Sequence, residues 1–339
     1  MSNKGITIAG NLLCDVVKSI DCYPEIGMLS DITAISQSVG GCVPNTIIDL
    51  AKMDRSLPLS AVGKVGKDDY GRYILEQLEE YGIDTSRVTR SADNHTSFSD
   101  VMNLPSGERT FFHCRGANAE FSPADIDIDG LSCDILHIGY LLLLDRFDAP
   151  DAEYGTAMAR FLHQVQQAGI KTSIDVVSSS TLSFEKIVKP ALKYCDYVIL
   201  NEIECCNIWG ISPYQGDALD IDAIKRAMQL TMQEGVKEKV IVHCKAAGFV
   251  LDRSGTFTAV PSLDIPSSDI KGCVGAGDAF CAACLYGIYN KMSDADILAF
   301  ASAAAACNLF SENSVDGMRS AAEIRQLETK YNRKELKTC

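Results

Sequence analysis

The sequence predicts an α/β fold in which a mainly parallel sheet is covered by helices on both faces. Three observations support this prediction: short apolar runs alternate with amphipathic stretches, the alternation continues over most of the 339 residues, and no composition shift, low-complexity tract or repeat divides the chain. Strands and helices that alternate in this way build parallel sheets that are buried on both faces. We therefore expect a single domain over residues 1–339.

The expected strands are apolar runs of four to six residues, a length typical of fully buried strands. They cover residues 6–9, 59–63, 135–139, 172–177, 197–200 and 240–244. The expected helices cover residues 45–53, 70–81, 156–168, 223–234 and 278–289. In the second helix, apolar residues recur at helical spacing from Tyr70 to Tyr81, and Gly82 is expected to end the helix.

Two segments, residues 12–38 and 94–118, interrupt this alternation. The second contains period-two stretches on either side of a Ser106-Gly107 turn, a pattern that favours a hairpin. Half-buried strands inserted in an α/β fold predict a small β-sheet lid over the carboxyl ends of the main strands, where open α/β sheets bind ligands. Because exposed strand edges pair readily between chains, we also expect a homodimer through the lid.

Charge and cysteine usage exclude several classes of protein. The 31 Lys and Arg residues and 45 Asp and Glu residues give a formal charge of −14, which argues against nucleic acid or an anionic membrane as the main partner. No apolar run of about 18 residues is present, and the 14 scattered cysteines are interpreted as reduced core residues of a cytoplasmic protein. Cys281 and Cys284 form the only CxxC pair; without a second pair at zinc spacing, they are interpreted as small residues on a buried helix.

The most informative segment is the glycine-rich loop over residues 271–280. Its glycines allow the amides of Ala276, Gly277 and Asp278 to point outward at a helix N-terminus, where they can stabilise a transferring phosphoryl group. Asp278 can then accept the proton of a substrate hydroxyl, as a weak base whose pKa the helix end lowers. An ordinary strand-to-helix turn explains the loop alone equally well. The GxGxxG nicotinamide fingerprint would need glycine at position 280, and no GxxxxGK[ST] phosphate loop occurs.

Two further polar groups flank expected strands. The first suits recognition of several hydroxyl groups, although turn chemistry alone accounts for each member; it comprises Asn11, Asp15, Gly40, Gly41 and Asn45. The second follows the strand at 197–200, where Asn201 and Glu204 can order Mg²⁺ through water. A plain helix cap made by these two residues is the alternative.

Together, and in this order, these motifs resemble the PfkB family of ribokinase-like carbohydrate kinases. Residues 40–53 resemble the first family signature, and residues 62–71 are similar to its VGxVGxDxxG stretch. Residues 107–110 with 116–118 resemble the return of the lid, Asn201 and Glu204 match the NxxE motif, and residues 275–278 match the GAGD motif. The resemblance extends from about residue 5 to residue 325.

The resemblance implies a Rossmann-like three-layer sandwich with a β-sheet lid, and ATP-dependent phosphorylation of a hydroxyl on ribose, fructose, 2-keto-3-deoxygluconate or a nucleoside. It assigns the base to Asp278 and the anion hole to Gly275, Ala276 and Gly277. It assigns the sugar contacts to Asn11, Asp15, Gly40, Gly41 and Asn45. It places ATP near Asn201, Lys245, Gly248 and Asn308, and Mg²⁺ near Glu204 and Asn201, with water between.

Some residues depart from the family pattern. Residues 272–274 replace an Asp-Thr-x sequence, which speaks against activation by potassium. Lys245 follows a replaced Thr-x-Gly turn and is either a phosphate contact or, as we favour, a solvated lysine. Cys273 is either a reactive thiol or, as we favour, a buried inert one, and His137 is interpreted as structural. The departures leave a catalytically silent homologue that binds a sugar or nucleotide as the alternative to an active kinase.

Overall fold

The computed structural model describes residues 4–106, 108–177 and 184–336. A nine-stranded sheet forms the centre, and its strands lie in the order β17 (Phe257–Pro261), β16 (Ala247–Asp252), β15 (Lys239–His243), β12 (Tyr197–Asn201), β11 (Lys171–Val176), β8 (Ile135–Leu141), β1 (Ile6–Gly10), β4 (Leu59–Val65) and β5 (Asp84–Arg90). The strands from β15 to β5 pair in parallel, whereas β16 and β17 add an antiparallel edge. The six expected strands are β1, β4, β8, β11, β12 and β15, so the prediction of a mainly parallel sheet is confirmed.

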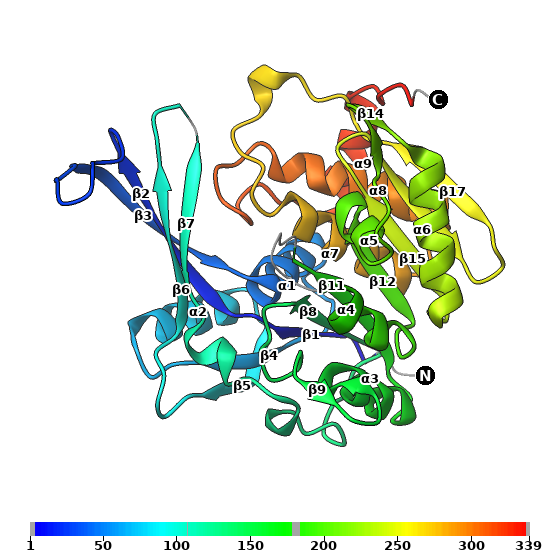
Figure 1. The fold of residues 1–339 in the computed structure, drawn as a ribbon. Coiled ribbons are helices and arrows are strands. Elements are labelled where there is room, and N and C mark those ends of the chain that lie inside the picture. Colours follow the sequence, from blue (N-terminus) through cyan, green and yellow to red (C-terminus); the bar gives the residue numbers. More distant parts are fainter. Residues whose placement is uncertain (1–3, 107, 178–183, 337–339) are drawn as a thin grey trace.

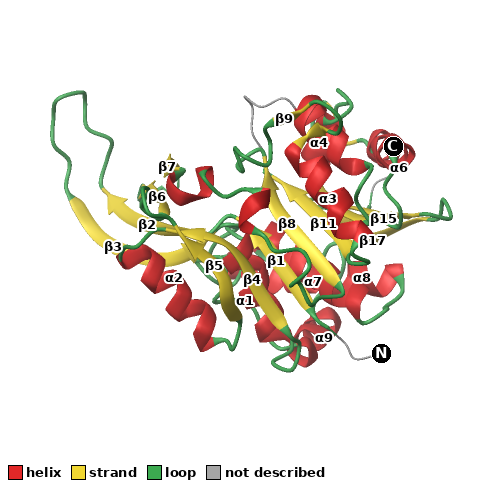
Figure 2. Cartoon of the chain, turned by 90° about the horizontal axis from the view of Figure 1, so that it is seen from below, coloured by secondary structure: helices red, strands yellow, loops and turns green. Residues whose placement is uncertain are grey.

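Helices cover both faces of this sheet (Figure 2). One face packs against α1 (Cys42–Met53), α2 (Asp69–Glu80), α7 (Ala276–Tyr289), α8 (Asp294–Asn308) and α9 (Ala321–Lys330). The other packs against α3 (Ala157–Gln167), α4 (Phe184–Leu192), α5 (Glu202–Asn207) and α6 (Ile221–Glu234). Side chains along each strand alternate between the two cores: Ile199 belongs to the first, while Val198 and Leu200 belong to the second. Three layers result, as the resemblance implies.

A four-stranded sheet projects from the main body (Figure 1). Its strand order is β3 (Ile32–Gly40), β2 (Leu13–Ile20), β6 (Ser97–Asn103) and β7 (Arg109–Cys114). The outer pairs β2–β3 and β6–β7 are antiparallel, and the central pair β2–β6 is parallel. Leu104 donates to the carbonyl of Glu108 across the expected hairpin turn, but Gly107 of that turn lies outside the described residues. Because β2 follows β1 almost directly, this sheet, called the lid below, starts at the carboxyl ends of the main strands.

Shorter elements complete the chain. Two-stranded hairpins join β9 (Pro150–Asp151) to β10 (Gly155–Thr156) and β13 (Tyr214–Gln215) to β14 (Ala218–Leu219). Across the described ranges, no helix has the length and apolar character needed to cross a membrane. The cysteines of those ranges form no disulfide, and most of them are buried in the core.

One carboxylate connects the base of the lid to the main body. Asp68 caps α2 by accepting from the amide of Gly71 at 2.9 Å, and it also accepts from the amide and hydroxyl of Thr96 at 2.7 and 2.6 Å. The hydroxyl of Thr96 in turn accepts from the amide of Gly66. Residue 96 directly precedes β6, so this cap also fixes the start of a lid strand.

We predict that Asp68→Ala lowers the free energy of unfolding by about 1–3 kcal/mol, because it removes a helix cap and leaves the Thr96 donors without their acceptor. Urea unfolding of both proteins measures the change. The neighbouring exposed Asp69 is the matched control, and Asp69→Ala should change the free energy by less than about 0.5 kcal/mol. Equal losses in the two variants would contradict the assigned role.

Candidate active site

Asp278 lies in the first turn of α7, at the carboxyl end of the sheet. The helix begins after Gly275, whose φ of 79° is in the left-handed region. A Cβ atom at Gly275 would lie 2.6 Å from Cβ of Ser314, so only glycine fits there. The amide of Ala276 donates to Cys273 at 3.4 Å. The first-turn amides of Gly277 and Asp278 are therefore the donors that this helix end offers to an anion.

Both carboxylate oxygens of Asp278 accept hydrogen bonds from other elements. Nδ2 of Asn45, on α1, donates to Oδ2 at 2.9 Å, and the hydroxyl of Tyr140, on β8, donates to Oδ1 at 2.6 Å. Asn45 is itself fixed by the hydroxyl of Ser314, which donates to its Oδ1 at 2.7 Å. The carboxyl group thus sits where α1, β8 and α7 meet.

Burial raises the pKa of Asp278 from its usual 3.8 to about 7, and the negative charge of Asp175 adds to the increase. The hydrogen bonds from Tyr140 and Asn45 lower the pKa but only partly offset the loss of hydration. The expectation that the helix end lowers this pKa is therefore wrong, because desolvation dominates. A carboxyl group that titrates near neutral pH is well suited to accept a proton.

A cavity of about 280 Å³ opens beside Asp278. Its lining includes Gly275 and Gly277 from the glycine-rich loop, and also Asn201 and Glu204. Asn201 and Glu204 also make a reciprocal helix cap: Oδ1 of Asn201 accepts from the amide of Glu204 at 2.8 Å, and Oε2 of Glu204 accepts from the amide of Asn201 at 2.9 Å. The helix-cap alternative is therefore confirmed. Both residues also line the cavity, so their role in ordering Mg²⁺ stays a prediction.

A second cavity, of about 420 Å³, lies between the lid and the loop over residues 310–316. Polar side chains dominate its lining, among them Asp15, Ser36, Ser38, Asn103, Arg109, Lys271 and Asn313. Burial raises the pKa of Asp15 to about 6, although a hydrogen bond from Ser99 and the charge of Arg109 lower it. Ser314 lines this cavity and holds Asn45, so one chain of hydrogen bonds connects the lid cavity to Asp278.

The other residues that were expected to contact the sugar are Asn11, Gly40 and Gly41, and each of them affects the path of the backbone. Asn11 is fully buried, and its Oδ1 accepts from the amide of Tyr140 at 2.7 Å, so it positions the backbone of Tyr140. Gly41 has a φ of 90°, and a Cβ atom there would lie 2.6 Å from the carbonyl oxygen of Asn11. At Gly40, a Cβ atom would lie 2.4 Å from Oδ2 of Asp15. Both glycines allow the backbone to pass close to polar groups.

Three residues expected near ATP lie outside the lining of the 280 Å³ cavity. Lys245 is exposed in the turn after β15. Gly248 is buried, and a Cβ atom there would lie 2.9 Å from Leu298, which indicates a packing role. Nδ2 of Asn308 donates to the carbonyl of Val274 at 2.7 Å and so supports the glycine-rich loop. Cys273 is exposed, so the expectation that it is buried is wrong.

Several residues that line the cavity were not expected at the site from the sequence, among them Tyr140, Asp175 and His243. His243 packs against Phe280 with ring centroids 4.9 Å apart, and burial lowers the pKa of His243 to about 4, so its ring is neutral. The sequence did hold a signal for Asp175, because this acid is the only charged residue of the apolar run at 172–177. Tyr140 offered the weaker signal of a polar group near the carboxyl end of an apolar strand.

Comparison with known proteins gives one consistent result. A family model described as pfkB family carbohydrate kinase matches residues 15–321. The 2-dehydro-3-deoxygluconokinase of Bacillus subtilis is 24% identical over 308 residues, covering 87% of each chain. The ribokinase of Arabidopsis thaliana is 25% identical over 324 residues, covering 95% of this chain and 80% of that protein.

Solved structures share the fold. The structure of Arabidopsis thaliana ribokinase complexed with ribose and ATP superimposes with a TM-score of 0.79 at 20% identity, covering 96% of this chain and 99% of the other. A putative ribokinase II from E. coli in complex with ATP and Mg²⁺ superimposes with a TM-score of 0.74 at 18% identity, with the same coverage. The three-layer architecture with a small second sheet is therefore that of the ribokinases.

We predict that Asp278→Asn stabilises the protein more at pH 8 than at pH 5. The folded state binds the Asp278 proton more tightly than the unfolded state, so the native carboxyl loses stability as the pH rises from about 4 through 7. Asparagine cannot ionise and avoids this loss. Thermal unfolding at the two pH values tests the difference, with the exposed Asp269→Asn as control. An unfolding temperature difference between Asp278→Asn and wild type that is the same at both pH values would contradict the prediction.

Proposed function

Because the chain belongs to the pfkB family of carbohydrate kinases, we propose that it transfers the γ-phosphate of ATP to a hydroxyl of an unphosphorylated sugar or sugar-like polyol. The observation that carries the proposal is the position of Asp278. Its carboxyl group lies at a helix N-terminus beside a cavity, and donors from two other elements fix both of its oxygens.

In the proposed reaction, Asp278 accepts the proton of the attacking hydroxyl. The amides of Gly277 and Asp278, with the positive end of the α7 dipole, stabilise the charge that develops on the transferring phosphoryl group. The transition state of phosphoryl transfer is loose, so positioning and charge stabilisation matter more than covalent assistance. Tyr140 and Asn45 hold the base in place.

Asn201 and Glu204 fit a magnesium ion, because a carboxylate and an amide are the hard oxygen ligands that it prefers. Mg²⁺ bound near them, with water between, would neutralise negative charge on the phosphates of ATP. Residues 272–274 offer no side-chain oxygen for a monovalent cation, so we propose a reaction that does not need potassium.

The lid cavity supports an acceptor that carries hydroxyl groups and no phosphate. Its charged residues are three acids (Asp15, Glu312 and Asp316) and two bases (Arg109 and Lys271), a balance that does not favour a phosphorylated sugar. Relatives of this chain are named for ribose, fructose and 2-dehydro-3-deoxygluconate. We propose these compounds and nucleosides as the acceptor panel, with Asp15 accepting from an acceptor hydroxyl.

We predict that Asp278→Asn lowers the turnover number at least about 100-fold while leaving acceptor affinity nearly unchanged, since a general base contributes about 10²–10⁴-fold to the rate. ADP release with Mg·ATP and the panel measures the first, and calorimetry measures the second. Asp269→Asn, an exposed substitution of the same type, should keep full activity. More than about a tenth of wild-type turnover in Asp278→Asn would contradict the assigned base, and binding without ADP release from any wild-type mixture would favour the silent homologue.

We propose that a second copy of the chain covers the lid. Apolar side chains are exposed on its outer strands and on the β2–β3 loop: Ile26, Leu29, Ile32, Ile35 and Phe112. Ile35 is 66% exposed and Phe112 is 56% exposed. The two outer strands, β3 and β7, also present edges that pair with no other strand of the described chain. Burial of these apolar groups between two copies would supply the main driving force for association.

We predict that the double variant Ile35→Lys with Phe112→Lys is monomeric, whereas the wild-type protein is a dimer at micromolar concentration. Two lysines on this surface would oppose dimer formation through charge repulsion and lost apolar contact. Sedimentation velocity measures both states. Leu230→Lys changes a similarly apolar, exposed residue on α6, away from the lid, and should remain dimeric. A monomeric wild-type protein would refute the dimer.

A further inference from the structure

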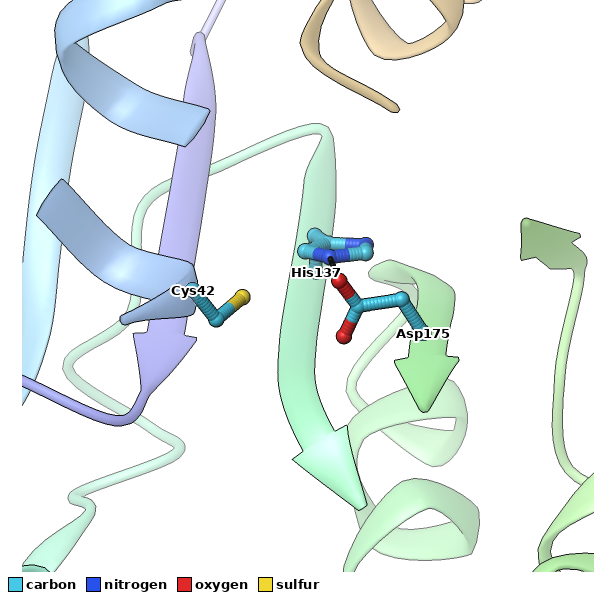
Figure 3. A group of neighbouring side chains, drawn as sticks. All are labelled: Cys42, His137 and Asp175. Carbon is cyan, nitrogen blue, oxygen red and sulfur yellow. Dashed lines mark ion pairs between the residues drawn. The ribbon is translucent and has the colours of Figure 1, made fainter. Parts of the chain in front are cut away.

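Three side chains of different chemistry converge near Asp278, and one of them, Asp175, lines the same cavity. Figure 3 shows Cys42 from α1, His137 from β8 and Asp175 from β11 pointing toward one another. One potential ligand atom from each residue lies within 4.8 Å of the other two. Cys42 and His137 are fully buried, and Asp175 is 6% exposed. The sulfur, nitrogen and oxygen atoms therefore share one enclosed region at the centre of the fold.

The imidazole of His137 has a fixed orientation. Its Nδ1 lies 2.9 Å from the hydroxyl of Ser173, so Nε2 is the atom that faces the cluster. Nε2 lies 3.6 Å from Oδ2 of Asp175 and 3.6 Å from Sγ of Cys281, a fourth buried side chain that comes from α7. A hydrogen bond at Nδ1 that orients the ring and leaves Nε2 for coordination is the usual arrangement of metal-binding histidines.

Asp175 provides a second, independent indication of a cation. Its Oδ1 is buried without a hydrogen-bond partner among the described residues. The adjoining cavity is lined by three carboxyl groups, those of Asp175, Glu204 and Asp278, and by no lysine or arginine of the described chain. A buried carboxylate is costly unless a cation compensates it. Gly139 makes room for this oxygen, because a Cβ atom there would lie 1.6 Å from Oδ1.

We propose that Cys42, His137, Asp175 and Cys281 form a binding site for one transition-metal ion of the zinc class. Two sulfurs, one imidazole and one carboxylate suit Zn²⁺, whereas Mg²⁺ prefers oxygen ligands alone. Tetrahedral bonds of about 2.0–2.3 Å place neighbouring ligand atoms about 3.3–3.8 Å apart, and the two separations at Nε2 are both 3.6 Å. Binding deprotonates the two thiols and releases their protons to solvent.

The ion would hold together the elements that carry the proposed base. Cys42 lies one helical turn before Asn45 on α1, and Cys281 lies one turn after Asp278 on α7. A bond from each sulfur to one ion fixes these two helices relative to each other, and so supports the contact between Asn45 and Asp278. The site does not depend on the proposed reaction, because its ligands are defined by their own geometry.

The experiment uses the full chain without an affinity tag, reduced and freed of metal by chelation. Titration with Co²⁺ should produce a thiolate-to-cobalt charge-transfer band and the intense visible bands of tetrahedral cobalt, saturating near one equivalent. Zn²⁺ should abolish these bands and raise the unfolding temperature of the wild-type protein. This test uses the wild-type protein alone, so it does not depend on whether a variant folds. The absence of a thiolate-to-cobalt band would overturn the proposal.

Variants identify the ligands. Cys42→Ser and Cys281→Ser should each lose about half of the charge-transfer intensity and weaken cobalt binding at least about tenfold. Cys284→Ser is the matched control, since Cys284 is equally buried on α7 and belongs to the hydrophobic core, and it should keep the wild-type spectrum. A band of unchanged intensity and affinity in Cys42→Ser would assign the metal to other thiols, such as the exposed Cys22 or Cys273, and would also overturn the proposal.

Discussion

The site depends on one constraint: a carboxyl group is kept in a largely desolvated position at the end of a helix. Three separate elements meet to hold it there, and each contributes a part that the others cannot. Helix α7 provides Asp278 itself, α1 provides the amide of Asn45, and β8 provides the hydroxyl of Tyr140. The same burial that opposes ionisation also raises the pKa of the carboxyl group toward neutrality. The protein thus gives up stability at the position where the proposed reaction would need a proton acceptor.

Much of the fold follows from local patterns. The apolar runs that became β1, β4, β8, β11, β12 and β15 are short and uncharged except at Asp175, and their alternation with helices predicts a parallel sheet without further information. The antiparallel edge of β16 and β17 was missed, because neither strand is separated from its neighbour by a helical pattern. The glycine-rich loop could also be predicted from the local sequence, because Gly275 adopts a backbone conformation that other residues rarely adopt.

The partners of Asp278 were harder to foresee, because they depend on which strands are neighbours. Tyr140 and Asp175 lie at the site because the strands that carry them, β8 and β11, are adjacent at the centre of the sheet. Asn11 shows the opposite case: its type and position fit a sugar contact, but its side chain turns inward to hold the backbone of Tyr140. Residue type at a strand end thus predicts the neighbourhood of a site, while side-chain direction decides the role.

The division of the two acidic groups between lid and body has a consequence for water. Asp15 is carried by lid strand β2, whereas Asp278 is carried by helix α7 of the main body. An acceptor that contacted both carboxyl groups at once would hold the lid and the main body together, whereas a single water molecule would not. Under the proposed reaction, binding of the acceptor alcohol would bring the two parts of the site together. Binding of water would not have this effect. If the proposed reaction is correct, the lid would then protect ATP from wasteful hydrolysis, because only an acceptor large enough to contact both parts would complete the site.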